Sequence, residues 1–510
     1  MKRIFALMLC ICLLLAGCGN TSQAYTPTGD GLTWDEDYTG PATDKTEQEQ
    51  EALVLTYYPE ITMNPYQCTD FTNRALFSLI YQGLFCVDRS YNVQPMLCKS
   101  YRISEDMMTY TFYIEKATFS DGSYLTVDDV VASLNAAWES DYYGGRFTFV
   151  ESIGLSADGA VQIELYIPYE NLPLLLDIPI IKATQLDATH PLGTGPYVLQ
   201  SSSVDGALRI RNNWWCSCEL PISTTSIRLV AAESETQIRD NFEFYDVNLV
   251  CADPGTDHYA DYRCDYELWD CENGMFIYLA CSADSNIFST TQMRSALTYA
   301  IDRDSLVEDY YRGFARSATL PASPLSPYYH QALASKYEYD PQKFTDAVAE
   351  AGLTEASVTL LVNSDDSLRL RVARAIGKML EEGGLVVKMK ELSGSDYFYA
   401  IQSRAFDLYL GQTKLSANMD LSPFFNTYGE LSFGGVNNME AYTLCKKAIE
   451  NHGNYYTLHK TVMDNGLLCP VISGSYAVYA TRGLLSSLSP ARDNIFYYSL
   501  GKTMEQALTK

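Results

Sequence analysis

The stretch from residue 358 to 411 alternates between strand-like and helix-like segments, and this alternation restricts the fold more than any other part of the chain. Its apolar runs are short, whereas Leu368, Val372 and Ile376 recur at the spacing of one helical face. A helical connection between two strands is long enough to place those strands side by side and parallel. We therefore predict a β-α-β-α-β unit, and with it an α/β lobe, from strands at 358–362, 385–389 and 406–410 and helices at 365–382 and 396–404.

The first third of the chain also mixes strands with helices. Period-two alternation over 110–114 and 161–167 predicts two half-buried strands. A further strand is expected at 53–55, and a helix over 70–83 that the glycine at its end stops. A capping box at its first residues opens the helix predicted over 126–138.

The N-terminus has the pattern of a lipoprotein signal. Two basic residues precede an apolar run over 4–15 that is too short to cross a bilayer comfortably. Small residues then lead to Cys18, whose thiol is the expected attachment point for diacylglycerol, with fatty acyl chains such as palmitate. Residues 1–17 are therefore predicted to be cleaved, and Cys18 to hold the chain on the outer face of a bacterial cytoplasmic membrane. The alternative is an ordinary secretory signal that ends by chance at a cysteine.

Residues 18–51 are predicted to form a flexible tether. Thr, Ser, Gly, Pro, Asp and Glu dominate this segment, so it holds too few apolar side chains to collapse. A flexible chain of that length spans about 30 Å root-mean-square. After the signal, no apolar run approaches the roughly 20 residues of a spanning helix, so the body is expected to lie above the membrane.

The charge of the chain argues against two classes of partner. With 63 Asp and Glu against 36 Lys and Arg, the formal charge is −27, which repels nucleic acid and anionic lipid. Solubility accounts for such a charge. A preference for cationic ligands is the alternative.

The cysteines are expected to be mostly reduced and buried. Of the fourteen, Cys10 and Cys12 leave with the signal and Cys18 takes lipid, and the odd number that remains cannot all pair within one chain. No two cysteines have zinc-knuckle spacing. A disulfide that closes the short loop between Cys264 and Cys271 stays open as an alternative.

No catalytic or metal-binding motif stands out. We therefore predict no enzymatic activity, no bound metal and no cofactor. The sequence contains none of the common zinc-protease, esterase, phosphate-loop or EF-hand patterns. The five histidines are scattered along the chain. A pair of carboxylates for glycoside hydrolysis depends on the fold, and a surface hydrolase of that kind stays open as an alternative.

Tyrosine is abundant, with 39 residues, and aromatic side chains often stand next to each other. Aromatic residues with a polar tip suit a cleft for an amphipathic ligand, and they also suit core packing. The adjacent pairs are Trp214-Trp215, Tyr310-Tyr311, Tyr328-Tyr329, Tyr397-Phe398-Tyr399 and Tyr455-Tyr456.

Five motifs stand out along the chain: Asn64-Pro65 with Ile80–Phe85, Tyr110–Ile114, Phe119–Gly122 with Leu125–Val130, Gly193–Tyr197 and Arg294–Arg303. The helix of the last motif is expected to begin with a capping box over Ser289–Gln292. In this order, which chance does not produce, the motifs resemble family 5 of the extracytoplasmic solute-binding proteins of ATP-driven (ABC) importers. That family is the class of oligopeptide-, dipeptide- and nickel-binding proteins.

The resemblance implies an α/β, two-lobe periplasmic-binding-protein-like fold of type II. The first lobe is expected at 52–270 with an inserted subdomain at about 66–187, the second at 271–475, and a return to the first lobe at 476–510. Such lobes close on a ligand and present it to a membrane permease. The resemblance therefore implies a monomer that captures a peptide or peptide-like solute for an ABC permease. A sensor or adhesion subunit on the same fold is the alternative.

The resemblance also implies one ligand-facing segment in each lobe. In peptide binders of this class an aspartate of the second lobe pairs with the free amine of the ligand, and the matching position here is Ala417. Either the ligand has no free α-amine at that point, or Asp420 replaces the missing carboxylate from three residues further along. The implied ligand-facing residues are Thr69, Asp70 and Phe71 of the first lobe and Lys414, Leu415, Ala417, Asn418 and Asp420 of the second.

Membrane attachment should depend on Cys18, because no other segment can enter a bilayer. We expect Cys18→Ala to release the protein into the medium, or to leave it held only by an uncleaved signal. Fractionation and metabolic labelling with a fatty acid measure both outcomes. A variant that is still acylated and membrane-bound would contradict this assignment.

Overall fold

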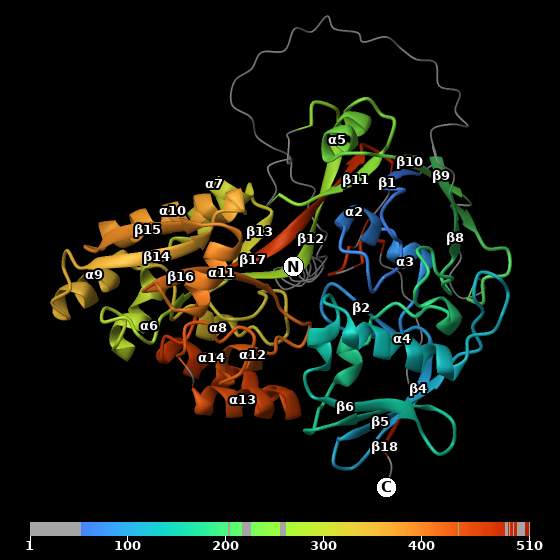
Figure 1. Ribbon diagram of the computed structural model, residues 1–510, viewed down its shortest axis with the longest axis horizontal. Helices are drawn as coiled ribbons and strands as arrows, with labels where there is room; N and C mark the ends of the chain where they lie inside the picture. Colours follow the sequence, from blue (N-terminus) through green and yellow to red (C-terminus); the bar gives the residue numbers. More distant parts are fainter. Residues whose placement is uncertain are drawn as a thin grey trace, which may run out of the picture.

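The computed structural model describes residues 53–201, 205–216, 226–254, 262–436, 438–484, 488, 490–492, 494–496 and 505–508. The predicted signal, Cys18 and the tether at 18–51 lie outside these residues. The fold is mixed α/β, with two lobes and a subdomain, as predicted (Figure 1). Each of these three parts is built on its own sheet, here called sheets I, II and III.

Sheet I forms the first lobe, with the strand order β1-β10-β9-β8. β1 runs parallel to β10, and the other neighbours are antiparallel. Its apolar side chains, Leu55 and Leu229 among them, are buried against two short helices of the chain that follows β1. The elements of this lobe are β1 (Val54–Tyr57), α2 (Phe71–Arg74), α3 (Phe77–Ile80), β8 (Tyr197–Ser201), β9 (Asp205–Ile210), β10 (Ser226–Ala231) and α5 (Glu235–Glu243).

Sheet II forms the subdomain, with the strand order β18-β4-β5-β7-β6. The predicted strands are present: Phe112 and Ile163 point into one buried layer with their period-two neighbours. The predicted capping box is also present, since Thr126 accepts from the backbone N–H of Asp129 and donates its own N–H to that carboxylate. The elements are β2 (Phe85–Val87), β3 (Val93–Pro95), β4 (Cys98–Ile103), β5 (Thr109–Ile114), α4 (Val127–Glu139), η1 (Gly144–Phe147), β6 (Val150–Leu155), β7 (Val161–Leu165), η2 (Leu172–Leu175), η3 (Ala183–Gln185) and β18 (Glu505–Leu508).

Sheet III forms the second lobe, with the order β11-β17-β12-β16-β14-β15 and β13 paired to β17. β14 lies parallel to β15 and to β16, so the predicted β-α-β-α-β unit is confirmed. The elements are β11 (Leu249–Ala252), β12 (Tyr266–Cys281), α6 (Thr291–Ala300), α7 (Arg303–Tyr311), β13 (Ala315–Ser317), α8 (Gln331–Ala334), α9 (Pro341–Glu350), β14 (Ser357–Asn363), α10 (Ser367–Glu382), β15 (Val386–Leu392), α11 (Gly394–Gln402), β16 (Leu408–Lys414), α12 (Ser422–Phe425), α13 (Met439–Glu450), η4 (His452–Asn454), α14 (Tyr455–Asp464) and β17 (Cys469–Thr481).

The two longest strands, β12 and β17, form an antiparallel ribbon between the lobes (Figure 1). One end of the ribbon pairs with β11 beside the first lobe, and the other end pairs with β16. The register shifts between Glu272 and Phe276, where Gly274 has a φ of +73°. Close to this bulge, Asp270 accepts hydrogen bonds from Arg89 of the subdomain at 2.7 Å and from Arg316 of β13 at 2.5 Å. The ribbon therefore connects all three parts.

The prediction of one continuous helix over 70–83 is wrong. Two short helices, α2 and α3, take its place, because Asn73 and Arg74 bind backbone groups of the preceding loop. The Asn73 amide bonds both the N–H and the carbonyl of Tyr58, and Arg74 donates to the carbonyl of Cys68 at 2.9 Å. Gly83 does not end a helix. A Cβ there would lie 2.9 Å from the carbonyl oxygen of Ile178, so the glycine permits close packing.

The capping box predicted over Ser289–Gln292 is also wrong. The N-cap of α6 is Thr290, whose hydroxyl accepts from the N–H of Met293 at 3.3 Å. Ser289 instead donates to the carbonyl of Asn286, and the Gln292 side chain donates to Glu350. The helix begins one residue later than predicted.

Several family-like motifs have a structural role. Asn64 is fully buried and donates from its amide to the carbonyls of Leu186 and Ala188. Gly193 and Gly195 pass so close to the end of α3 that a Cβ on either would clash with Ile80. These residues fix the chain around 186–195 against the first lobe.

Arg303, the last residue of the segment Arg294–Arg303, has a buried guanidinium. It is 3 % exposed and donates to the carbonyls of Ala318 and Pro470 and to the end of α6. Burial lowers the pKa of this group, since the charged form loses hydration. Arg303 thereby ties α6, α7 and β17 together at the start of the ribbon.

The cysteines that the structure describes form no disulfide, as expected, and most of them are buried. No disulfide joins Cys264 to Cys271, so that alternative is not realised. Within the described ranges, no helix is both long enough and apolar enough to cross a membrane.

The stability of the second lobe should fall in acid because of His459. This side chain is 0 % exposed, neither ring nitrogen has a hydrogen-bond partner among the described residues, and burial lowers its pKa to about 3. The unfolded chain takes up a proton below about pH 6.5, whereas the folded chain does not. Between these values the free energy of unfolding should decrease by up to about 1.4 kcal/mol per pH unit.

We expect His459→Leu to remove about 2 kcal/mol of the stability difference between pH 7.5 and pH 5, measured by denaturant unfolding. The matched control is His190→Leu, because His190 lies on the surface. Equal pH dependence in wild type and His459→Leu would contradict the assignment.

Candidate functional site

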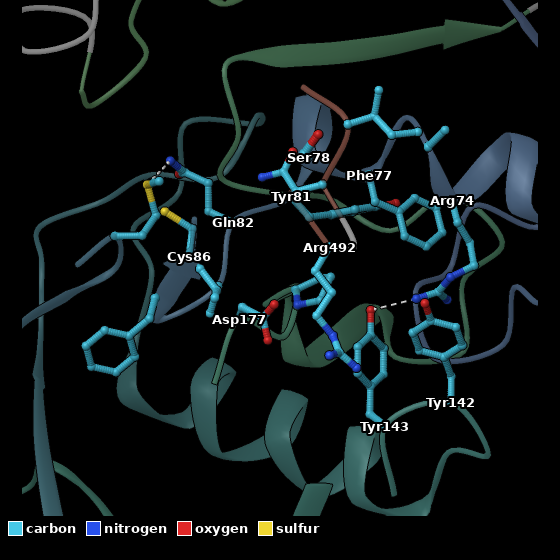
Figure 2. A pocket seen from close by; sticks show the side chains of 18 of the residues that line it. Arg74, Phe77, Ser78, Tyr81, Gln82, Cys86, Tyr142, Tyr143, Asp177 and Arg492 are labelled. Atoms are coloured by element: carbon cyan, nitrogen blue, oxygen red, sulfur yellow. Dashed lines mark hydrogen bonds between the residues drawn. The ribbon is translucent and has the colours of Figure 1, made fainter. Parts of the chain in front are cut away.

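A cavity lies where the first lobe, the subdomain and the segment after the ribbon meet (Figure 2). Its free volume is about 130 Å³. Helices α2 and α3 supply one wall, residues 142–146 of the subdomain a second, and Tyr476, Arg492, Asn494 and Ile495 a third. Three segments far apart in sequence thus enclose one space.

Charged side chains line this cavity in unequal numbers. Arg74, Arg146 and Arg492 all contribute guanidinium groups, whereas Asp177 is the one carboxylate among the described lining residues. Arg146 forms an ion pair with Asp177 and donates to the carbonyl of Leu175 at 3.3 Å. The cavity therefore carries positive charge within an acidic protein.

Arg74 is held rigidly at the cavity wall. It is 9 % exposed and donates to the carbonyls of Pro65 and Cys68 and to the Tyr143 hydroxyl at 3.0 Å (Figure 2). Its guanidinium carbon lies 3.2 Å from the ring centroid of Tyr142. The tyrosine ring thus offsets part of the cost of burying the cation.

Lys414 of the second lobe reaches the same tyrosine. Its Nζ donates to the Tyr142 hydroxyl at 2.5 Å and lies 4.5 Å from the ring centroid. Tyr142 therefore contacts a cation from each lobe. This contact brings the second lobe to the cavity wall.

The other predicted residues of the first lobe have separate roles. Thr69 and Phe71 line the cavity, and Phe71 stacks on Tyr476 of β17 with 3.8 Å between ring centroids. Asp70 caps α2 by accepting from the N–H of Asn73 at 2.8 Å. Burial raises the pKa of Asp70, and hydrogen bonds from the backbone oppose the shift.

None of the predicted residues of the second lobe, Lys414 included, is among the described residues that line this cavity. Leu415 and Ala417 are buried, and the Leu415 carbonyl accepts from Arg492. Asn418 donates to the hydroxyl of Tyr169 in the subdomain at 2.7 Å. These residues contact the subdomain or the core, and their assignment to the ligand stays a prediction.

The Asp420 carboxylate accepts hydrogen bonds from its own loop. Its carboxylate accepts from the backbone N–H of Ser422 at 2.8 Å and from the Ser422 hydroxyl at 2.6 Å. Burial raises its pKa, and these hydrogen bonds oppose the shift. Asp420 borders a separate gap of about 10 Å³ beside Arg146 and Asn418, which is room for about one water molecule.

The subdomain and the second lobe touch directly. The backbone N–H of His452 donates to Glu170 at 2.7 Å, and the N–H of Glu170 donates to the carbonyl of Ile449 at 3.1 Å. One continuous apolar cluster includes buried residues of both parts. The subdomain and the second lobe are thus in contact in this structure.

The sequence analysis missed most of the cavity. The tyrosine pair at 142–143 has the same form as the aromatic pairs singled out above, none of which lines the cavity. Trp215 comes near, since it donates to Gln82, a lining residue, at 2.8 Å. No local signal marks the arginines, because they reach the cavity from three distant segments.

The described residues contain no group of three or more His, Cys, Asp or Glu side chains that could hold a metal ion. The arrangement combines fixed cations with aromatic faces. Fixed polar groups beside apolar and aromatic faces are typical of sites for small molecules.

Comparisons with known proteins agree with this architecture. Residues 92–434 match the family described as bacterial extracellular solute-binding proteins, family 5 Middle. The glutathione-binding protein GsiB of Salmonella choleraesuis is 23% identical over 400 residues, which cover 71% of this chain and 75% of that protein.

Two solved structures share the fold. The ABC transporter substrate-binding protein CtaP of Listeria monocytogenes superposes with a TM-score of 0.71 at 17% identity, over 87% of this chain and 97% of that one. The oligopeptide-binding protein AppA of Bacillus subtilis, in complex with a nonapeptide, gives 0.61 at 20% identity, over 88% and 99%. Since the family match covers more than half of the sequence, the chain belongs to family 5 of the bacterial extracellular solute-binding proteins, the solute-capturing proteins of ABC importers.

Proposed function

We propose that this protein captures a peptide or peptide-like solute in the cavity beside Arg74 and Tyr142 and delivers it to the permease of an ABC importer. It acts as a monomer that lipid on Cys18 holds at the outer face of the membrane. The observation that carries the proposal is the contact of Lys414 with Tyr142, because it brings the second lobe against a cavity that the first lobe and subdomain form.

The relatives support a peptide-like ligand. GsiB is named for glutathione, a tripeptide, and AppA was solved with a nonapeptide. The cavity has about 130 Å³ of free volume in this structure, which favours the short end of that range.

A surface hydrolase and a sensor or adhesion subunit, the two alternatives to solute capture, would each need different features. Glycoside hydrolysis needs two carboxylates that flank the bond, whereas the described lining holds Asp177 alone, in an ion pair with Arg146. Binding is therefore favoured over hydrolysis. A sensor or adhesion subunit would keep the binding site but lack adjacent permease and ATPase genes.

The proposed function requires that ligand binding and closure of the lobes depend on the contact between Lys414 and Tyr142. We expect the ligand that co-purifies with the protein, identified by mass spectrometry, to reduce the radius of gyration in small-angle scattering. Lys414→Met should weaken its binding roughly tenfold, since the variant loses a cation–π contact and a hydrogen bond.

The matched control is Lys446→Met. Lys446 also lies over a tyrosine ring, that of Tyr442, but both residues belong to α13. This control should bind and contract like wild type. An unchanged radius at saturation, or equal affinity of wild type and Lys414→Met, would contradict the proposal.

A free α-amine should contribute little to binding. Ala417 offers no carboxylate, and the Asp420 carboxylate accepts two hydrogen bonds from Ser422 outside the cavity. N-acetylated short peptides should therefore stabilise the protein against heat at least as well as the free peptides. A ligand at a hundredfold excess over its Kd adds about 2.7 kcal/mol. If acetylation and Asp420→Asn both abolish binding of a peptide, Asp420 is the amine anchor and this prediction is wrong.

A further inference from the structure

We propose that a second cavity, on the face of the ribbon opposite to the first, binds a small organic amine in its cationic form, with an apolar body. Residues of β12, of α7 and of the segment that leads into β13 line this cavity, here called the α7 cavity. Its free volume is about 510 Å³, compared with about 130 Å³ for the cavity beside Arg74. The inference goes beyond the proposed function and does not depend on it.

The two cavities lie on opposite faces of the ribbon. Cys271 of β12 pairs with Tyr476 of β17, which lines the first cavity. The next pair along the ribbon is Asp270 with Ala477, and Asp270 lines the α7 cavity. Successive side chains of a strand point to opposite faces. The apolar clusters agree, since Tyr476 packs with the first lobe whereas Leu268 and Ala477 pack in a different cluster.

The size of the α7 cavity suits an organic solute. Protein interiors contain few voids larger than a water molecule, whereas sites for small molecules measure about 300 to 1,000 Å³. Regular structure surrounds the space, because β12 and β13 both pair with β17 and α7 lies beside them (Figure 1). The α7 cavity is thus built into the scaffold of the second lobe.

One part of the lining is apolar. Leu268 of β12, Val307 of α7 and Phe314 just before β13 are half-buried and line the cavity. Ala315, the first residue of β13, also lines it and is buried. Covering the apolar surface that these side chains still expose contributes about 25 cal/mol per Å². The solute therefore carries an apolar or aromatic portion.

Another part of the lining holds two carboxylates of α7. Asp304 and Glu308 are four residues apart, so they lie on the same face of the helix, and both line the cavity. Like charges at this spacing repel each other. A cation between two such carboxylates is attracted by both.

Glu308 has an open capacity for a ligand. Among the described residues, no hydrogen bond or ion pair occupies its carboxylate, whereas Asp304 accepts from the Ser317 hydroxyl. An ionised carboxylate can only accept hydrogen bonds. The solute must therefore supply the donors, which an ammonium group does.

The other charges of the lining do not reverse this preference. Asp270 and Arg316 form an ion pair with each other, and Asp270 also pairs with Arg89. With Arg312 included, the lining carboxylates outnumber the lining guanidinium groups by three to two. The charge of −27 of the whole chain attracts cations as well.

Three indole compounds that differ in one group test this inference. Tryptamine carries an ammonium, tryptophol has a hydroxyl in its place, and indole-3-propionate ends in a carboxylate. Each compound is titrated by calorimetry into the full chain at pH 7, where the amine and the carboxylates are charged. We expect tryptamine to bind about tenfold or more tightly than tryptophol, and indole-3-propionate to bind most weakly.

Variants assign the binding to the α7 cavity. Glu308→Gln keeps the shape of the side chain and removes its charge, so it should reduce the affinity for tryptamine about tenfold and leave that for tryptophol unchanged. Asp309→Asn is the matched control, because Asp309 is also exposed on α7 but does not line the cavity. This control and Lys414→Met, which alters the contact beside the first cavity, should both bind tryptamine like wild type.

Each other outcome overturns a stated part of the inference. Equal affinity for tryptamine and tryptophol would overturn the choice of a cation. Binding of tryptamine that Glu308→Gln leaves unchanged, or that Lys414→Met weakens, would overturn the choice of the α7 cavity. If none of the three compounds binds at millimolar concentration, the whole inference is wrong. Contraction of the protein with its co-purified ligand is measured separately, so solute capture stands or falls independently.

Discussion

The pairing of β12 with β17 is the interaction on which the rest of the structure depends. Each strand is shared by both halves of the molecule: one end of the ribbon lies beside β11 and the other beside β16 or β13. Arg303 fixes the start of β17, and Asp270 joins the ribbon to the subdomain and to β13. Apart from two register shifts, the hydrogen-bonded ladder runs from one half of the molecule into the other, so it fixes the register between them.

The predictions from sequence held where the structure depends on local chemistry. The β-α-β-α-β unit follows from periodicity, and the Thr126 capping box from hydrogen bonds within one helical turn. They failed where distant groups intervene. The helix expected over 70–83 is broken because Asn73 binds the backbone of Tyr58, an interaction that no local pattern reveals.

The cavity was harder to predict for the same reason. Its arginines come from positions 74, 146 and 492, and only the completed fold brings them together. The motifs that resemble the family mostly hold the scaffold: Asn64 and Gly193 support the first lobe, and Arg303 supports the second. Residues that decide which solute binds can therefore differ among proteins that share every one of these motifs, and the resemblance alone specified the fold better than the ligand.

Arg492 connects the cavity to the bulge of the ribbon. A Cβ on residue 274 would lie 2.5 Å from the Nη2 atom of Arg492, so only glycine fits beside it. One side chain therefore lines the cavity and packs against the backbone between the lobes. The two arginines differ in what their replacement would affect during the evolution of a new specificity. A change at Arg146 leaves the ribbon as it is, whereas a change at Arg492 also leaves a space against the ribbon. Lineages that adopt another solute should accumulate compensating substitutions around Gly274 only when Arg492 is replaced.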